Sequence, residues 1–368
     1  MNVLDFFEDL EDPRDKRGLI YEVRTIVFIT LAAVLSGCDD YEEIAEFGKQ
    51  RRDWITQFVR LPEGRNISHD AFTDFYSALD PKKFGDCFLN WTASVCRLSK
   101  EELISIDGKR VRGSYDNHTS TEAIHIVSAY ATHAGVTLAQ EKVDTKSNEI
   151  VAIPKLLEML ELNGSSVSID AMGCQTTIAK KIISQGGQYL LAVKGNQGKL
   201  YDDIQYSFRE LTITDSNSTI EKSHGRIEKR TCEIITDLKM IEQSEKWESL
   251  SRLVRINTKT TEVITNKTSE ETRYYISSHN ESAEHLNATA RGHWGIENNV
   301  HWMLDVVYNE DHSRIRIGNG AENFSTIRRI SLNVLKLDQS SKKSQKVKRK
   351  TASWNLGYLQ KLMKIEHF

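Results

Sequence analysis

The sequence predicts an α/β fold in which a mixed sheet with crossover helices carries a β-rich insertion and follows a small helical domain. Short apolar runs alternate with amphipathic segments from about residue 99 onward, which is typical of strands and helices in turn. The residues before that point show helical periodicity alone. With 368 residues the chain has room for two or three domains, and we expect the divisions at residues 1–98, 99–338 and 339–368.

Residues 1–98 are predicted to be helical. An apolar-rich helix over residues 24–36 ends at Gly37, and Asp39-Asp40 and then Ser68 can cap the next two helices. Asp80-Pro81 breaks the chain before a fourth helix at residues 84–96. A pair of helices of this kind can read DNA, although plain packing is the more common use.

The order of elements after residue 99 indicates a particular α/β fold. Strands are predicted at residues 103–106, 123–131, 136–143, 166–169 and 189–193, with helices at 153–162, at 176–184 and after Leu200. The second and third strands form a hairpin around Gly135. The resulting β-β-β-α-β-α-β-α order is that of the RNase H-like fold, a mixed sheet with crossover helices.

Two segments depart from this alternation. Residues of about 215–278 are β-rich with polar links, and we expect this β insertion to pack as its own small sheet beside the active site. Helices follow at residues 284–304 and 322–337. Residues 339–368 form a polar, basic tail, which we expect to be mobile and to stay out of the core.

Composition narrows the class of protein. The longest apolar run is too short to span a bilayer, and because no charged n-region with a cleavage site precedes it we do not expect secretion. The five cysteines are scattered without CxxC spacing, so we expect reduced thiols in a cytoplasmic protein and no zinc site. The net charge of −3 is not that of a general nucleic-acid binder, but basic residues cluster locally, at 222–230, at Arg314 and Arg316, and at 342–350. Each cluster alone is typical of a solvated face, whereas several around acidic residues favour a path for DNA.

Three acidic residues stand out by position. Asp107 in SIDGK and Asp170 in SIDAMGCQ each end a predicted strand, and Glu297 in HWGIENN lies on a predicted helix. Each has an ordinary alternative, as an Asp-Gly turn, a loop or capping aspartate, and a surface glutamate. Brought together, three carboxylates repel one another and need one or two hard cations, for which Mg²⁺ is suited and Mn²⁺ can substitute. Such a cluster is the centre of two-metal phosphodiester chemistry.

Six blocks of sequence, in order along the chain, resemble the signatures of DDE transposases from bacterial insertion sequences, and most closely the H-repeat-associated (ISAs-type) group. The blocks are IDGKRVRGS, KSNEI, SIDAMGCQ, YLLAVKGNQ, HGRIEKR and HWGIENNVHWMLDVVYNEDHSRIR, and the early DFFEDLEDPRDKRG resembles the associated N-terminal domain of that group. By this resemblance Asp107, Asp170 and Glu297 match the catalytic Asp, Asp and Glu of an RNase H-like DDE catalytic domain. The wider superfamily often has Arg and Lys four before and seven after the glutamate, where this chain has His293 and Leu304.

The resemblance implies a transposase that cleaves DNA strands and transfers them in DNA transposition, as a homodimer on double-stranded DNA in the bacterial cytoplasm, associated with the nucleoid. Candidates for DNA contacts are Lys109, Lys194, His224, Arg226, Arg230, Arg291 and His293. His293 and His301 could bind zinc in principle, but neither has HExxH spacing, so DNA contacts or packing are expected of them. Asp305 and the Glu310-Asp311 pair are further acids that could be secondary metal ligands or structural partners. Two alternatives stay open: a stand-alone nuclease of the same fold, and a DNA-binding relic without catalysis.

Overall fold

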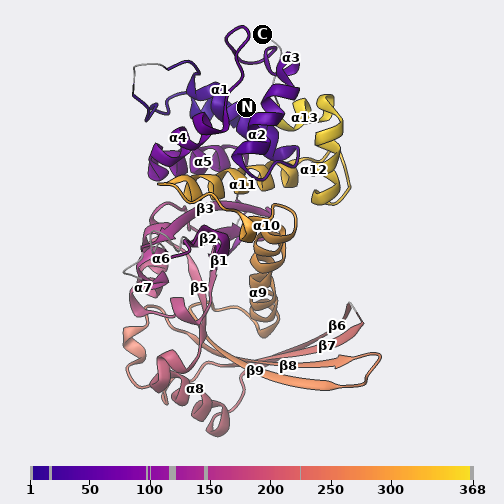
Figure 1. Ribbon diagram of the computed structural model, residues 1–368. Coiled ribbons are helices and arrows are strands. Elements are labelled where there is room, and N and C mark those ends of the chain that lie inside the picture. Colours follow the sequence, from indigo (N-terminus) through magenta and orange to yellow (C-terminus); the bar gives the residue numbers. More distant parts are fainter. Residues whose placement is uncertain are drawn as a thin grey trace.

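The computed structural model has a helical layer at one end, an α/β region in the middle and a long β arm at the other end (Figure 1). It describes residues 3–15, 19–96, 98–99, 101–115, 122–144, 148–223 and 225–364. The lysine and serine of the KSNEI block and His224 of the HGRIEKR block therefore lie outside the described residues.

The helical layer is built from the first part of the chain, as its periodicity predicts. Its helices are α1 (Val23–Leu35), α2 (Tyr41–Gln50), α3 (Arg52–Ile55), α4 (His69–Ala78) and α5 (Pro81–Val95). Asp40 and Ser68 accept hydrogen bonds from the backbone at the start of α2 and α4, as predicted. Asp80 caps α5, and Pro81 opens this helix three residues before its predicted start, because proline at the first helical position needs no hydrogen-bond partner.

One long helix joins the helical layer to the sheet. Helix α11 (Gly320–Leu337) packs against α1, α4 and α5 on one side and against a sheet strand on the other. Almost all of its residues are buried, including Arg328 and Arg329. The N-terminal helices and the end of the chain therefore share one hydrophobic core.

The described strands form one nine-stranded sheet in the order β3-β2-β1-β4-β5-β9-β8-β7-β6. Its first five strands are β1 (Leu103–Arg110), β2 (His125–Ala131), β3 (Val136–Val143), β4 (Ser166–Ile169) and β5 (Gln188–Val193). Strands β1 to β3 are antiparallel, whereas β4 and β5 run parallel to β1. Helices α6 (Glu149–Glu158), α7 (Thr176–Ser184) and α8 (Gly198–Glu210) connect and follow the parallel strands. This is the mixed RNase H-like sheet that the order of elements predicts.

The β insertion does not form a separate sheet, contrary to the prediction. It contains β6 (Asp215–Ser223), β7 (Arg226–Ile235), β8 (Arg252–Glu262) and β9 (Thr268–Ser277), and β9 pairs antiparallel with β5. The physical reason is that β5 would otherwise present a row of unpaired backbone N–H and C=O groups. The insertion therefore extends the central sheet, and its outer half projects as an arm (Figure 1).

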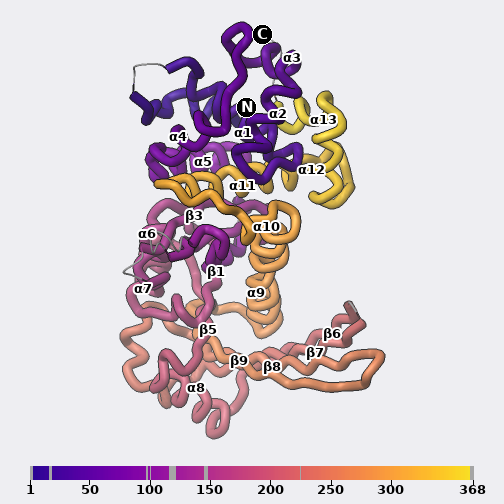
Figure 2. The backbone as a smooth tube through the Cα atoms, in the orientation of Figure 1, coloured from indigo at the N-terminus to yellow at the C-terminus, as the bar shows by residue number. Residues whose placement is uncertain are grey.

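The basic tail is folded and packed, which also corrects the prediction. Helices α12 (Gln345–Trp354) and α13 (Leu356–Met363) pack against α1 and α11, in the helical layer where the chain begins (Figure 2). Lys348 donates to the backbone oxygen of Leu335 near the end of α11, and Arg349 donates to that of Val34 near the end of α1. Cations are stabilised at helix C-termini, and helical spacing places these two side chains with Ala352 on a buried face.

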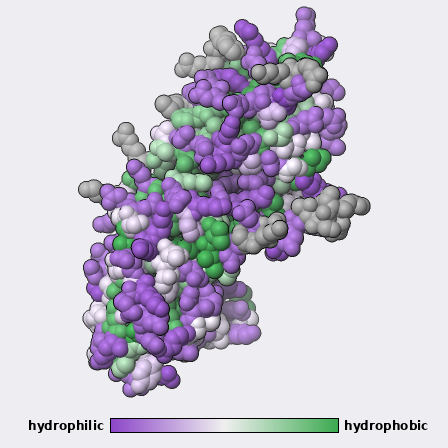
Figure 3. Space-filling view, turned by 90° about the vertical axis from the view of Figure 1, so that its left-hand side faces the viewer, coloured by the Kyte–Doolittle hydropathy of each residue, from purple (hydrophilic) through white to green (hydrophobic). Residues whose placement is uncertain are grey.

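The surface of the molecule fits a folded chain with a polar exterior. Hydrophilic residues cover most of the face in Figure 3, and apolar areas on it are small. Among the described residues, we find no helix with the length and apolar character that crossing a bilayer requires.

Candidate active site

Asp107 lies inside β1, one residue past the point where β1 stops pairing with β4. The strand continues to Arg110 because it pairs with β2 along this stretch, so Asp107 does not end the strand as predicted. Ile106 pairs in parallel register with Ile169, the last residue of β4. The residue that follows each of these is an aspartate, so Asp107 and Asp170 lie next to each other where the parallel pairing of β1 and β4 ends, inside the sheet.

Asp170 has two roles in local structure. Its side chain accepts from the backbone N–H groups of Met172 at 3.0 Å and Gly173 at 3.4 Å. It thereby caps a short 3₁₀ turn over Ala171–Gly173, not the helix that begins at Thr176. These bonds hold the carboxyl group at the end of β4.

Glu297 approaches Asp107 from the helix that follows the insertion. Helix α9 (Ala283–Ile296) packs across β1, and Gly292 permits this close approach, since a Cβ there would lie 2.4 Å from the Leu103 side chain. Glu297 opens a π-helical turn, Glu297–His301, before α10 (Trp302–Val306). The sequence predicts a regular helix here, and π turns are often found at functional sites.

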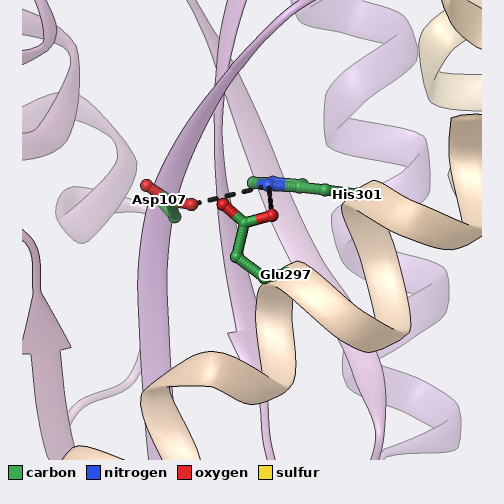
Figure 4. Close-up of side chains that lie close together, drawn as sticks. All are labelled: Asp107, Glu297 and His301. Carbon is green, nitrogen blue, oxygen red and sulfur yellow. Dashed lines mark ion pairs between the residues drawn. The ribbon is translucent and has the colours of Figure 1, made fainter. Parts of the chain in front are cut away.

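The close-up in Figure 4 shows that Asp107, Glu297 and His301 point toward one another. The Nδ1 atom of His301 lies 3.5 Å from Asp107 Oδ2 and 3.4 Å from Glu297 Oε2. One ligand atom from each residue falls within 4.8 Å of the others. Two carboxylates and an imidazole at this spacing form a donor set that fits a divalent cation.

We call Asp107, Asp170 and Glu297 the acidic centre. The electrostatics of this centre favour a bound cation. Burial, together with the charges of Glu297 and Asp170, raises the pKa of Asp107 to about 8. Burial and the charge of Glu149 raise the pKa of Asp170. The neighbouring His301 ring lowers the pKa of Glu297, because it favours the carboxylate form. Negative charge is therefore costly at Asp107 and Asp170 unless a cation balances it.

Glu149 is a fourth carboxylate near the centre, and the sequence does not identify it. It is the first residue of α6, where Asn148 caps the helix, and its Oε1 lies 2.9 Å from His125 Nε2. A Cβ on Gly108 would lie 2.3 Å from this oxygen, so Glu149 packs directly against the strand residue that follows Asp107. The only sequence signal was its place in the KSNEI block, which assigns it no role.

Lys109 forms ion pairs with carboxylates of the protein, which does not fit the predicted contact with DNA. Its Nζ lies 2.7 Å from Asp305 Oδ1, 2.7 Å from Asp311 Oδ1 and 3.9 Å from Glu310 Oε2, and the side chain is 7% exposed. Glu310 is fully buried and also lies 3.4 Å from Arg329. Of the two predicted possibilities for these three acids, the geometry favours that of structural partners, which hold β1 in place.

Two other DNA-contact candidates lie beside the acidic centre. Lys194 is exposed after β5, and its charge acts to lower the pKa of Asp170. His293 is half-buried, and its Nδ1 lies 2.9 Å from the hydroxyl of Ser168. Burial lowers the pKa of His293 to about 4, so this ring is neutral and less suited to a phosphate than a cation would be.

The remaining candidates lie on the arm or face it. Arg226 is exposed at the start of β7. Arg230 is buried and pairs with Glu228, which leaves its guanidinium less open to DNA than predicted. Arg291 on α9 is exposed, and its guanidinium lies 3.3 Å from Glu221 of β6.

The molecule combines an RNase H-like sheet, the adjacent aspartates Asp107 and Asp170, and a helix that leads to Glu297 after a β insertion. These features define a class of RNase H-like proteins with an acidic centre. A family model described as "Transposase DDE domain" matches residues 98–334, and one described as "DDE_Tnp_1-associated" matches residues 4–92. The chain belongs to this family of DDE transposases, as the six sequence blocks predict.

Curated relatives agree with this assignment. The chain is 40% identical over 359 residues to "H repeat-associated putative transposase YhhI" of Escherichia coli K12, covering 95% of this chain and 94% of that protein. It is 37% identical over 369 residues to "Putative transposase YncI" of Escherichia coli O157:H7, covering 98% and 94%. A solved structure of a piggyBac transposase synaptic complex with hairpin DNA covers 98% of this chain and 76% of that chain at 11% identity, with a TM-score of 0.48 too low to bear on fold or function.

Proposed function

We propose that this transposase catalyses divalent-metal-dependent strand cleavage at the ends of its insertion sequence and transfer of the cleaved strand to target DNA. The observation that supports it most is the meeting of Asp107 and Glu297, with Asp170 beside Asp107 where the parallel pairing of β1 and β4 ends. Membership of the DDE transposase family supplies the class of chemistry.

Asp107, Asp170 and Glu297 would hold Mg²⁺, for which Mn²⁺ can substitute. When bound, the ions supply Lewis-acid stabilisation of the charge that develops in phosphodiester cleavage. Asp107 must lose its proton before it can hold a cation, because its raised pKa keeps it protonated near neutral pH. Lys109 keeps β1, and with it Asp107, fixed through its ion pairs with Asp305 and Asp311.

Double-stranded DNA, both as element ends and as target, is the proposed substrate. An insertion sequence has two ends, whereas the described part of one chain contains one acidic centre. A homodimer on DNA would supply one centre for each end, which is why we expect that assembly. The exposed Lys194 and Arg226 are the candidates best placed to meet phosphates.

Two alternatives give different products. A stand-alone nuclease of the same fold would cleave DNA without joining the 3′ end to a target, so an assay for strand-transfer products separates it from a transposase. A DNA-binding relic would bind element ends but cleave nothing in Mg²⁺ or Mn²⁺. The acidic residues of the centre are intact, which favours an active enzyme over the relic.

The test replaces each carboxylate of the centre by its amide. In Asp107→Asn, Asp170→Asn and Glu297→Gln we expect cleavage of element-end DNA to fall by at least about 10²-fold, more than the loss of an outer-shell partner costs. DNA binding should persist, since no positive charge is removed. Gel assays of cleavage and binding on the same protein measure both.

Asp202→Asn is the matched control, because Asp202 is an exposed aspartate on α8, outside the acidic centre. It should cleave like the unchanged protein. Full cleavage by any of the three amide variants would remove that residue from the proposed site.

A further inference from the structure

His301 occupies a position that packing alone does not explain. It ends the π-helical turn that Glu297 opens, and its ring is 5% exposed. Its Nε2 is buried without a hydrogen-bond partner among the described residues, so the polar groups that this ring meets lie on the side of the other nitrogen. The other nitrogen, Nδ1, is the one that faces the carboxylates (Figure 4).

The distances around Nδ1 match those between neighbouring ligands of one cation. Ligands that lie about 2.1 Å from a metal ion are separated from one another by roughly 3 to 3.5 Å. His301 Nδ1 lies 3.5 Å from Asp107 Oδ2 and 3.4 Å from Glu297 Oε2. Both distances exceed the usual length of an N–H···O hydrogen bond, and neither oxygen is clearly preferred.

We propose that His301 is itself a metal ligand, and that one cation site of the acidic centre is formed by Asp107, Glu297 and His301. This inference rests on the proposed function, which it deepens by adding a nitrogen donor to a set of carboxylates. An imidazole ligand favours Mn²⁺ over Mg²⁺, whereas an all-carboxylate site suits Mg²⁺. The protein should therefore bind Mn²⁺ the more tightly of the two.

The π turn gives this proposal a structural basis. It lies between α9 and α10, and it places residues four apart, Glu297 and His301, toward the same carboxylate of β1. His293, one turn before Glu297, also has a ring near the centre, but its Nδ1 is engaged by Ser168. The two histidines therefore provide a test position and a matched control on one helical segment.

The test is pulsed electron paramagnetic resonance of Mn²⁺ bound to the full-length protein. We expect nitrogen coupling to the Mn²⁺ electron spin, and we expect protein with ¹⁵N-labelled histidine to show the changed coupling of that isotope. His301→Gln should lose the coupling and bind Mn²⁺ more weakly by at least the roughly tenfold that an outer-shell partner is worth. Mg²⁺ affinity should fall less. His293→Gln should keep the coupling.

The spectrum of the unchanged protein decides the matter even if His301→Gln does not fold. Bound Mn²⁺ without nitrogen coupling would overturn the inference and leave His301 as an internal counter-ion for the two carboxylates. In that case metal-dependent cleavage of element ends would still support the proposed function. Absence of any Mn²⁺ or Mg²⁺ binding to the protein would overturn the metal site of the proposed function as well. Nitrogen coupling that disappears in His293→Gln but persists in His301→Gln would show that His293 is the ligand, and it would overturn the inference.

Discussion

At the scale of single residues, the proton on Asp107 competes with a cation for the same carboxyl group. The pKa of this residue rises to about 8 in the folded protein from an ordinary value of 3.8, because burial and the charges of Glu297 and Asp170 disfavour the carboxylate. Between those pH values the folded chain binds more protons than the unfolded chain. The stability of the metal-free protein should therefore fall as pH rises through this window.

A cation should reverse this dependence. We expect Mg²⁺ to raise the melting temperature little at pH 6 and progressively more toward pH 9, because Asp107 must be deprotonated to bind it. Melting temperatures measured by calorimetry at several pH values, with and without Mg²⁺, give the result. Asp107→Asn should flatten the pH dependence of the metal-free protein. If Mg²⁺ stabilised the unchanged protein equally at every pH, proton release from Asp107 would not be linked to metal binding.

How far single residues can be predicted depends on what fixes their surroundings. Asp107 and Asp170 were identifiable because each follows a run of apolar residues, and the parallel pairing of β1 and β4 places them side by side. Glu149 was not, because its position depends on the packing of α6 beside β1, over residues far apart in sequence. His301 was interpreted as a DNA contact or packing residue because it lacks the HExxH spacing of a zinc ligand, and a π turn leaves no clear signal in hydrophobic periodicity.

At the scale of elements, helix α12 joins three parts of the chain through one side chain. Arg349 donates to the backbone oxygens of Val34 at 2.9 Å and Cys38 at 3.1 Å, and to Asp39 Oδ1 at 2.7 Å. It also donates to the backbone oxygen of Val307, just after α10. The tail thus ties the first helix of the chain to the segment that carries Glu297.

Removing this guanidinium should be costly. We expect Arg349→Ala to lower the free energy of unfolding by about 3–5 kcal/mol, because it removes a buried guanidinium and leaves the half-buried Asp39 and several carbonyls without this donor. Lys350→Ala, one residue on but exposed, should change it by less than about 0.5 kcal/mol. Urea unfolding followed by circular dichroism measures both. Equal, small effects would mean that α12 is only loosely attached.

Elements were predicted well where their signals are local and less well where pairing is distant. The caps of α2 and α4 and the hairpin of β2 and β3 depend on neighbouring residues, and the structure agrees with them. The pairing of β9 with β5 joins segments far apart in the chain, and the sequence does not reveal that β5 needs a partner. The tail was predicted to be mobile because its basic residues were counted as uniformly polar, whereas Lys348 and Arg349 bond to helix ends elsewhere in the chain.

At the scale of the whole molecule, the β arm and the Glu297 helix form one continuous unit. Asn287 of α9 donates to Asn217 of β6 at 2.9 Å, and the Arg273 guanidinium lies 4.7 Å from the centre of the Trp294 ring. Leu286 and Ala290 of α9 share a buried cluster with residues of β7 and β8. The arm is therefore packed firmly against the helix that leads to Glu297. DNA bound along the arm would be held in a fixed position relative to the acidic centre.

The two arginines of the arm should then behave differently, although the sequence predicted the same role for both. Arg226 is exposed at the start of β7 and has no acidic partner within 4 Å among the described residues, so it is free to contact a phosphate. Arg230 is buried and paired with Glu228. Arg226→Ala should weaken binding to element-end DNA and reduce the slope of log affinity against log salt by about 0.9, the value for one phosphate contact on duplex DNA.

Arg230→Ala should leave that slope unchanged. Any loss of affinity should follow a loss of stability, because the substitution leaves Glu228 on the arm without its partner. Arg226→Lys is the conservative control and should keep the slope, since lysine engages a phosphate as a point charge. Affinities for element-end duplex at several salt concentrations, with unfolding curves of the same proteins, separate the two effects. A reduced slope for Arg230→Ala with full stability would show that its pair with Glu228 opens on DNA. An unchanged slope for Arg226→Ala would leave the HGRIEKR segment as a solvated face of the arm.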